Sequence, residues 1–255
     1  VKPDTWQRDE RNIPADAPAG DTAWSAPQDD FDRSVIPPAG PNPAIKVPPV
    51  YRAELPNGIK ILGAVNDETP TTTIRIRMKV GQSHDPLDKL GLAANLAQYL
   101  NDAATQKSSA EDLSNRLAKL GSSVRFGAGD EFTNVSIRTL TENLDETMAI
   151  AMEKLFEPSF NADDFNRLKG QTIEGIKSSK KQASSVASET FWRRIYGDNN
   201  AVSWNGSGTV ETVENTDLED YKAFYENHYS PKIASIIAVS DLGEDQITET
   251  LSALS

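Results

Sequence analysis

The stretch GLAANLAQYL at residues 91–100 decides the fold predicted for this chain. It follows a strand-like run, a glycine and a proline, and it opens a helix. Leu92, Leu96 and Leu100 recur every four residues, which places them in one stripe along the helix. An apolar stripe of this kind indicates a helix that packs one face against a core.

The run before this helix, residues 71–80, alternates apolar and polar side chains and predicts a strand. Its apolar face would carry Ile74, Ile76, Met78 and Val80. Its other face would carry Arg75, Arg77 and Lys79, so that this side of the sheet is either solvated or covered by polar groups.

Similar patterns predict the remaining elements. Further strands are expected at 51–55, 59–65, 124–128, 133–139 and 233–239, the last of them fully buried. Helices are expected at about 89–104, 109–120, 142–156, 162–182, 186–196, 217–229 and 244–254, with a Gly/Asn/Ser-rich loop at 198–215. Two strand-rich regions separated by helices indicate an α+β domain with a mixed sheet and helices gathered mainly on one face.

Composition limits the function. The net charge of -12 argues against nucleic acid or an anionic membrane as partner, since both reward clustered Lys and Arg. No apolar run approaches the roughly 20 residues of a membrane span. Cysteine is absent, and the only histidines are His84 and His228, for which surface and helix-end roles are expected. So few histidines make a metal site within this chain improbable.

Proline divides the chain into two parts. Ten of the fifteen prolines lie in residues 1–49, which we predict to be an extended proline-rich linker or surface strap, with a flexible tail as the alternative. Residues 50–255 are expected to form the folded domain.

Several phrases of this domain resemble the insulinase/pitrilysin family of zinc metallopeptidases, which includes the mitochondrial processing peptidases. They are LPNGIKI at 55–61, VGQSHDP at 80–86, KLGLA at 89–93, SAE at 109–111, LG at 120–121, FEPSF at 156–160, IYG at 195–197, LEDYKAFY at 218–225 and HYSP at 228–231. The resemblance covers residues 50–255 and implies a largely antiparallel mixed sheet with helices mainly on one face.

The resemblance also implies where zinc would be held. Active domains of the family carry an H-x-x-E-H motif on the helix that opens after the glycine. In this chain its two histidine ligands fall on Ala94 and Gln98, and its general base falls on Ala97. The third ligand, a glutamate on a later helix, falls at Glu174 or Gly175. A catalytic zinc needs about three protein ligands, so we expect no metal in this chain and no catalysis by the chain alone.

Family members usually work as pairs of halves, and this chain resembles the half that lacks the metal. The resemblance therefore implies a zinc-bearing catalytic domain or subunit as partner, fused or separate, and a peptide bound in a chamber between the two. Two alternatives stay open, a structural scaffold without proteolysis and an active metallopeptidase with an unrecognised site. Bacterial family members suggest an exported, periplasmic location.

Three residues are candidates for contact with a peptide substrate. Trp204 precedes the glycine-rich segment at 205–208, where active family domains have a loop that lines the chamber. Arg75 and Arg77 lie on the polar face of their strand and would attract acidic or extended peptides. An ordinary exposed loop and a solvated strand face are the alternatives for these positions.

Overall fold

A computed structural model describes residues 48–255 together with Asp32, Ser34 and Gly40. The predicted strap at residues 1–49 therefore lies almost entirely outside the described residues. The first regular element is β1, which begins at Val50.

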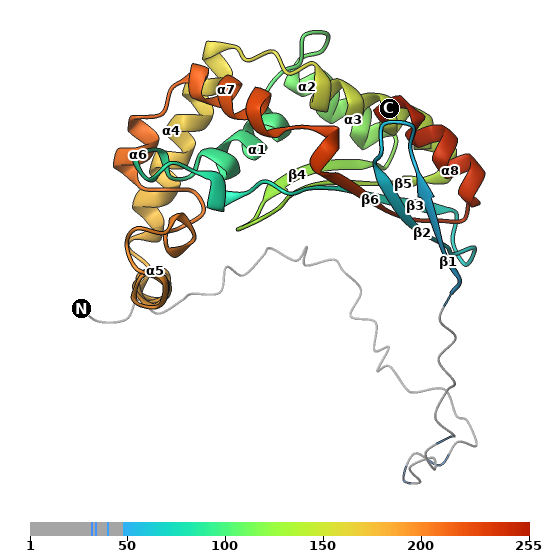
Figure 1. The fold of residues 1–255 in the computed structure, drawn as a ribbon, viewed down its shortest axis with the longest axis horizontal. Coiled ribbons are helices and arrows are strands. Elements are labelled where there is room, and N and C mark those ends of the chain that lie inside the picture. Colours follow the sequence, from blue (N-terminus) through green and yellow to red (C-terminus); the bar gives the residue numbers. More distant parts are fainter. Residues whose placement is uncertain (1–31, 33, 35–39, 41–47) are drawn as a thin grey trace, which may run out of the picture. The chain divides into compact units, whose positions relative to one another are not determined.

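Six strands form one mixed sheet, in the order β1-β2-β6-β3-β5-β4 (Figure 1). The strands are β1 (Val50–Glu54), β2 (Lys60–Val65), β3 (Thr71–Met78), β4 (Ser123–Ala128), β5 (Thr133–Leu140) and β6 (Ala234–Ser240). The pairing of β2 with β6 is parallel, and the other four pairings are antiparallel. This confirms the predicted fold class.

Eight α-helices accompany the sheet in the described residues. They are α1 (Leu92–Asp102), α2 (Ala110–Lys119), α3 (Leu144–Phe156), α4 (Ala162–Ser179), α5 (Ala183–Tyr196), α6 (Val210–Glu214), α7 (Leu218–His228) and α8 (Glu244–Leu251). Of these, α1, α2, α3 and α8 contact strands directly, while α4, α5 and α6 gather beyond one end of the sheet (Figure 1). The predicted helix at 109–120 is confirmed as α2, and it is capped by the Ser109 side chain, which accepts a hydrogen bond from the Asp112 N–H.

The core lies between the sheet and this helix layer. Leu92, Leu96 and Leu100 of α1 are all buried in it, as their four-residue spacing predicted. They pack in the same cluster as the inward residues of β3, which include Ile74 and Ile76. Transfer of such side chains out of water is worth about 1.5–3 kcal/mol each, so this stripe fixes α1 against the sheet.

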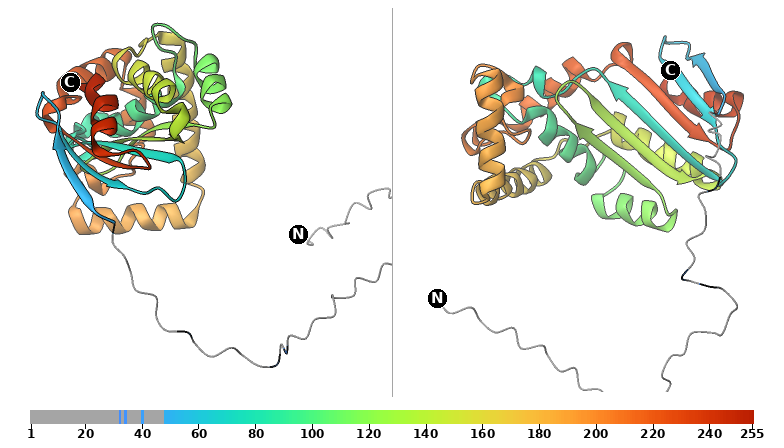
Figure 2. Two further views of the ribbon diagram at one scale, coloured as in Figure 1. Left: turned by 90° about the vertical axis from the view of Figure 1, so that its right-hand side faces the viewer. Right: turned by 90° about the horizontal axis from the view of Figure 1, so that it is seen from below.

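The opposite face of the sheet is open within the described part of the chain, and Figure 2 (right) shows the strands in front of the helices from that side. The prediction that 233–239 is fully buried is wrong for this reason. Alternate residues of β6 point to the open face, where Ile237 is 40% and Val239 39% exposed. A run of apolar residues does not reveal whether one or both faces of a strand are covered.

Two features of the helical end of the domain differ from the sequence-based expectation. The predicted loop at 198–215 contains the short helix α6, whose N-cap Thr209 accepts a hydrogen bond from the Thr212 N–H. The predicted helix at 186–196 exists as α5, but none of its residues is buried. Five of its large apolar side chains are between 43% and 56% exposed, namely Val186, Phe191, Trp192, Ile195 and Tyr196.

Candidate functional site

The start of α1 is held by a buried carboxylate. Asp85 accepts hydrogen bonds from the N–H groups of Gly91, at 2.8 Å, and Ala93, at 2.9 Å. Gly91 adopts the left-handed conformation with φ of 94°, which lets the chain turn into the helix. Burial raises the pKa of Asp85 to about 6, although the backbone N–H groups of Ala93, Gly91 and Leu92 oppose that rise.

The raised pKa of Asp85 predicts that the stability of the protein depends on pH in the acidic range. The protonated form is favoured in the folded chain, so the contribution of Asp85 to the free energy of unfolding is complete below 3.8, the ordinary pKa of an aspartate, and is lost as the pH rises through about 6. We expect the stability of the wild type relative to Asp85→Asn to fall by up to about 3 kcal/mol over that window. Urea unfolding of both proteins at several pH values measures it, and parallel pH profiles would contradict it.

The four positions implied for zinc and its general base line one cleft of about 580 Å³ between α1, α4 and the end of β4. Ala94, Ala97 and Gln98 come from α1, and Gly175 comes from α4. Glu174 instead ion-pairs with Lys177 at 2.8 Å, its side chain is 73% exposed, and it does not line this cleft. Of the two positions, only Gly175 lines the cleft, and its correspondence to the third ligand stays a prediction.

These four residues do not fit a zinc ion. Two methyl groups and a glycine offer no electron pair, and a carboxamide is a poor replacement for imidazole. The Gln98 amide nitrogen also donates to the carboxylate of Asp102. Within residues 48–255 and the three described residues before them, no group of three His, Cys, Asp or Glu side chains is arranged to hold a metal.

The loop that follows α5 packs tightly against the start of α1. Gly208 has φ of +82°, and a Cβ on it would lie 2.0 Å from the Leu90 carbonyl oxygen. Asn95 of α1 donates to the Ser207 carbonyl at 3.3 Å, and both residues line the cleft. Two residues of the glycine-rich segment, Asn205 and Ser207, thus form part of the wall of this cleft.

The candidate residues for peptide contact lie in different places. Trp204 donates from its indole Nε1 to the Asp198 carbonyl at 3.0 Å, with the Arg193 guanidinium 4.2 Å from its ring centre. Arg75 is exposed on the open sheet face, and Arg77 on the same face lies 3.5 Å over the Phe132 ring. None of the three candidates lines the cleft of the zinc positions. A role in substrate contact stays a prediction for each of them.

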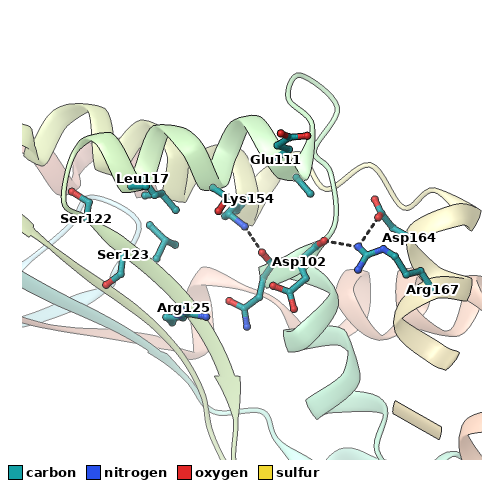
Figure 3. A pocket seen from close by; sticks show the side chains of 14 residues that line it. Asp102, Glu111, Leu117, Ser122, Ser123, Arg125, Lys154, Asp164 and Arg167 are labelled. Carbon is teal, nitrogen blue, oxygen red and sulfur yellow. Dashed lines mark hydrogen bonds and ion pairs between the residues drawn. The ribbon is translucent and has the colours of Figure 1, made fainter. Parts of the chain in front are cut away.

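A second cleft, of about 690 Å³, lies between α2 and the outer edge of β4 (Figure 3). Lys154 is buried at its wall and donates to the carbonyl oxygens of Leu100, at 3.3 Å, and Asn101, at 2.6 Å. Burial lowers the pKa of this lysine. Its side chain therefore satisfies the C-terminal end of α1. Sequence reasoning missed this cleft, because a lysine among helical residues normally predicts a solvated face.

The two histidines of the chain lie together, although 144 positions separate them in the sequence. Their ring centres are 5.4 Å apart in an edge-on arrangement, and His228 also contacts Phe224. Burial, together with the neighbouring His84, lowers the pKa of His228. Neither histidine lines the cleft of the zinc positions.

Solved structures define the class to which this fold belongs. The inactive domain of a family M16 peptidase from Pseudomonas fluorescens superposes with a TM-score of 0.76 at 22% identity, over 81% of this chain and 50% of that chain. The first half of the periplasmic protease PqqL from Escherichia coli gives 0.70 at 16% identity, over 80% and 45% of the two chains. The described domain therefore has the fold of the M16 inactive domain.

The sequence identifies the family. The family described as Insulinase (Peptidase family M16) matches residues 61–203, more than half of the chain. The chain therefore belongs to the insulinase family of peptidases. It is 24% identical to an uncharacterized zinc protease of Streptomyces coelicolor over 80% of this chain, and 22% identical to the non-peptidase homolog YmxG of Helicobacter pylori over 76%. In both comparisons it spans 44% of the relative's length.

Proposed function

We propose that this chain is a catalytically inactive half of an insulinase-family peptidase, which pairs with a zinc-bearing half. The two together form a peptide-binding chamber that supports metal-dependent proteolysis. The observation that carries the proposal is the cleft in which Ala94, Ala97, Gln98 and Gly175 stand at the positions implied for zinc and its base. The cleft is retained while the residues able to bind a metal are absent from it.

Surfaces that need a partner support the pairing. Helix α5 exposes five large apolar side chains within one short segment, and contiguous apolar patches of this kind mark interaction sites. The helix lies at one end of the folded domain of residues 48–255 and projects toward the side of the open sheet face (Figures 1 and 2). The chain also spans less than half of its curated relatives' length, which leaves room for a second half in one polypeptide or in another.

This pairing predicts that a charge on α5 weakens the assembly. Trp192 is 43% exposed, so Trp192→Glu should leave the isolated domain folded while it raises the Kd for the zinc-bearing half by about tenfold or more. Sedimentation of the two purified halves measures this. Leu87, which is 47% exposed outside α5, provides the control variant Leu87→Glu. Equal effects of the two variants would contradict the assignment of α5.

A scaffold without proteolysis is the second candidate function. The similarity to YmxG, which is described as a non-peptidase homolog, favours it. The coding sequence beside this one separates the two candidates, because an intact H-x-x-E-H in an adjoining domain or reading frame supports the chamber and its absence supports the scaffold. An active peptidase with an unrecognised site is the third candidate.

We also propose an exported, periplasmic location, in view of the similarity to the first half of a periplasmic protease. No helix among the described residues is long and apolar enough to span a membrane. Fractionation of cells that carry the tagged full-length product tests the location, and recovery with the cytoplasmic marker would contradict it.

The decisive experiment for the proposed function is purification of the full-length gene product with any zinc-bearing partner, followed by zinc analysis and a peptide-cleavage assay. We expect cleavage that needs both halves and stops when a chelator removes the zinc. Cleavage by residues 1–255 alone would support an unrecognised site in this chain. A complete assembly that retains zinc but cleaves no peptide would support the scaffold.

A further inference from the structure

Strand β4 is an edge of the sheet, because it pairs only with β5 in the strand order of the described chain. The outer edge of such a strand presents N–H and C=O groups that an extended peptide can use as a template for a further strand. Both clefts described above lie along this edge. Phe126, Gly127 and Ala128 line the cleft of the zinc positions, while Ser123, Val124 and Arg125 line the second cleft.

The middle of the β4 edge is already occupied by a side chain. Asn101 donates from Nδ2 to the Phe126 carbonyl oxygen at 2.8 Å, and its Oδ1 accepts from the Phe126 N–H at 2.8 Å. These are the two hydrogen bonds that a residue of a neighbouring antiparallel strand would make. The carboxamide therefore takes the place of a backbone amide at this position.

Two basic side chains hold the end of α1 on which Asn101 lies. Asn101 belongs to the last turn of α1, and its own carbonyl oxygen accepts a hydrogen bond from the buried Lys154 ammonium at 2.6 Å. Arg167 binds the neighbouring Asp102 carbonyl oxygen at 2.8 Å. Figure 3 shows both cations directed at this end of α1. The two cations thus fix the helix end that carries Asn101. The side-chain carboxamide is therefore already positioned beside β4 and loses little conformational freedom when it binds the strand.

The contact divides the edge into two separate parts. Since Phe126 directs its N–H and C=O outward to Asn101, Val124 and Ala128, each two residues away, direct theirs to the same side. Val124 lies in one cleft and Ala128 in the other. An incoming strand needs several such residues in succession, and Asn101 leaves only one on each side of itself within β4.

We infer that Asn101 closes the β4 edge to extended peptides and is a specificity-determining residue of this edge. A peptide that lies beside Ala94 and Gln98 pairs with β4 at Ala128 at most, and its path along the strand ends at Asn101. This wall of the chamber then contacts a peptide through side chains, and the partner half sets the register in which the peptide is held. The functional role inferred for Asn101 rests on the proposed chamber, but the experiment that tests the closed edge does not require the chamber.

The test uses the whole chain, Asn101→Ala and a short soluble fluorescent peptide of alternating threonine and valine with lysine at each end. Removal of the carboxamide frees both Phe126 groups, so we expect the variant to bind this peptide about tenfold more tightly than the wild type in anisotropy titrations. The same peptide with methylated backbone nitrogens should lose that gain. The control is Asn57→Ala, which removes a carboxamide that donates to the Leu254 carbonyl oxygen at 2.7 Å, far from β4.

A folded Asn101→Ala protein that binds the peptide no more tightly than the wild type would overturn the inference. Should that variant not fold, Asn101→Asp keeps an acceptor for the Phe126 N–H but has no donor for its carbonyl, and should show an intermediate gain. Hydrogen exchange gives an independent readout, since the Phe126 amide should exchange slowly in the wild type and quickly in Asn101→Ala. Equal exchange rates would also overturn the inference. Because none of these measurements needs zinc or a partner, failure of the proposed function leaves their outcome unchanged.

Discussion

Zinc binding should appear when ligands are restored at three positions of this chain. In Ala94→His/Gln98→His/Gly175→Glu, two imidazoles on α1 and a carboxylate on α4 face the same cleft, which supplies the three protein ligands of a catalytic zinc site. A Cβ on Gly175 meets no atom within 4 Å, so a side chain can begin at this position without a clash at Cβ. We expect zinc affinity to rise by at least about two orders of magnitude over the wild type, measured by competition with a chromogenic chelator.

The chain offers a matched control for this experiment. Gly170 also lies on α4 and also has no atom within 4 Å of an added Cβ, but it does not line the cleft. Ala94→His/Gln98→His/Gly170→Glu should therefore bind zinc as weakly as the two-histidine variant. Equal affinities of the Gly175 and Gly170 variants would contradict the assignment of Gly175.

Restoration of the α1 motif alone should not restore peptidase activity. Ala94→His/Ala97→Glu/Gln98→His still has Gly175 where a third ligand is needed, and the hydrogen-bond partners that orient metal-bound histidines are unprepared. We expect weak zinc binding and no metal-dependent peptide cleavage above the wild type. Robust cleavage that a chelator abolishes would show this expectation to be wrong.

Substitution of Gly208 should cause a large loss of stability. Gly208→Ala combines a φ of +82°, which costs an ordinary residue about 1–2 kcal/mol, with a Cβ placed 2.0 Å from the Leu90 carbonyl oxygen. Relief of that overlap needs a backbone shift in the segment that leads into α1, and overpacking costs about 1–3 kcal/mol more. We expect the free energy of unfolding to fall by about 2–5 kcal/mol in urea titrations.

Gly121 separates the two causes of this loss. Its φ is +61°, also positive, but a Cβ on it would meet no atom within 4 Å. Gly121→Ala should therefore lose only the conformational part, about 1–2 kcal/mol. If Gly121→Ala and Gly208→Ala were destabilised equally, the tight packing of Gly208 against Leu90 would not be what stabilises the cleft wall.

Local periodicity predicted most of the fold. The spacing of Leu92, Leu96 and Leu100 carries direct information about which face is buried, and so does the alternation of β3 from Ile74 to Met78. The exposed faces of β6 and α5 were not predictable in this way. Ile237 and Phe191 have the sequence pattern of buried residues, and their exposure depends on what lies opposite them in three dimensions.

The site was predictable in part for the same reason. Ala94, Ala97 and Gln98 lie within one helix, so their common face follows from helical geometry. The choice between Glu174 and Gly175 depends on the rotation of α4 relative to α1, which the sequence does not specify. The contact of Asn101 with Phe126 depends on where the end of α1 meets the edge of the sheet, and no local pattern marks it.

The cleft lined by Ala94, Ala97, Gln98 and Gly175 lacks the residues that would hold zinc, and we propose that it binds none. Titration of zinc into the purified, metal-stripped chain, followed by calorimetry and by metal analysis after gel filtration, tests it most directly. We predict no stoichiometric binding, and no difference between the wild type and a variant with Gln98→Ala. One zinc ion per chain that survives gel filtration and is lost on Gln98→Ala would contradict the claim.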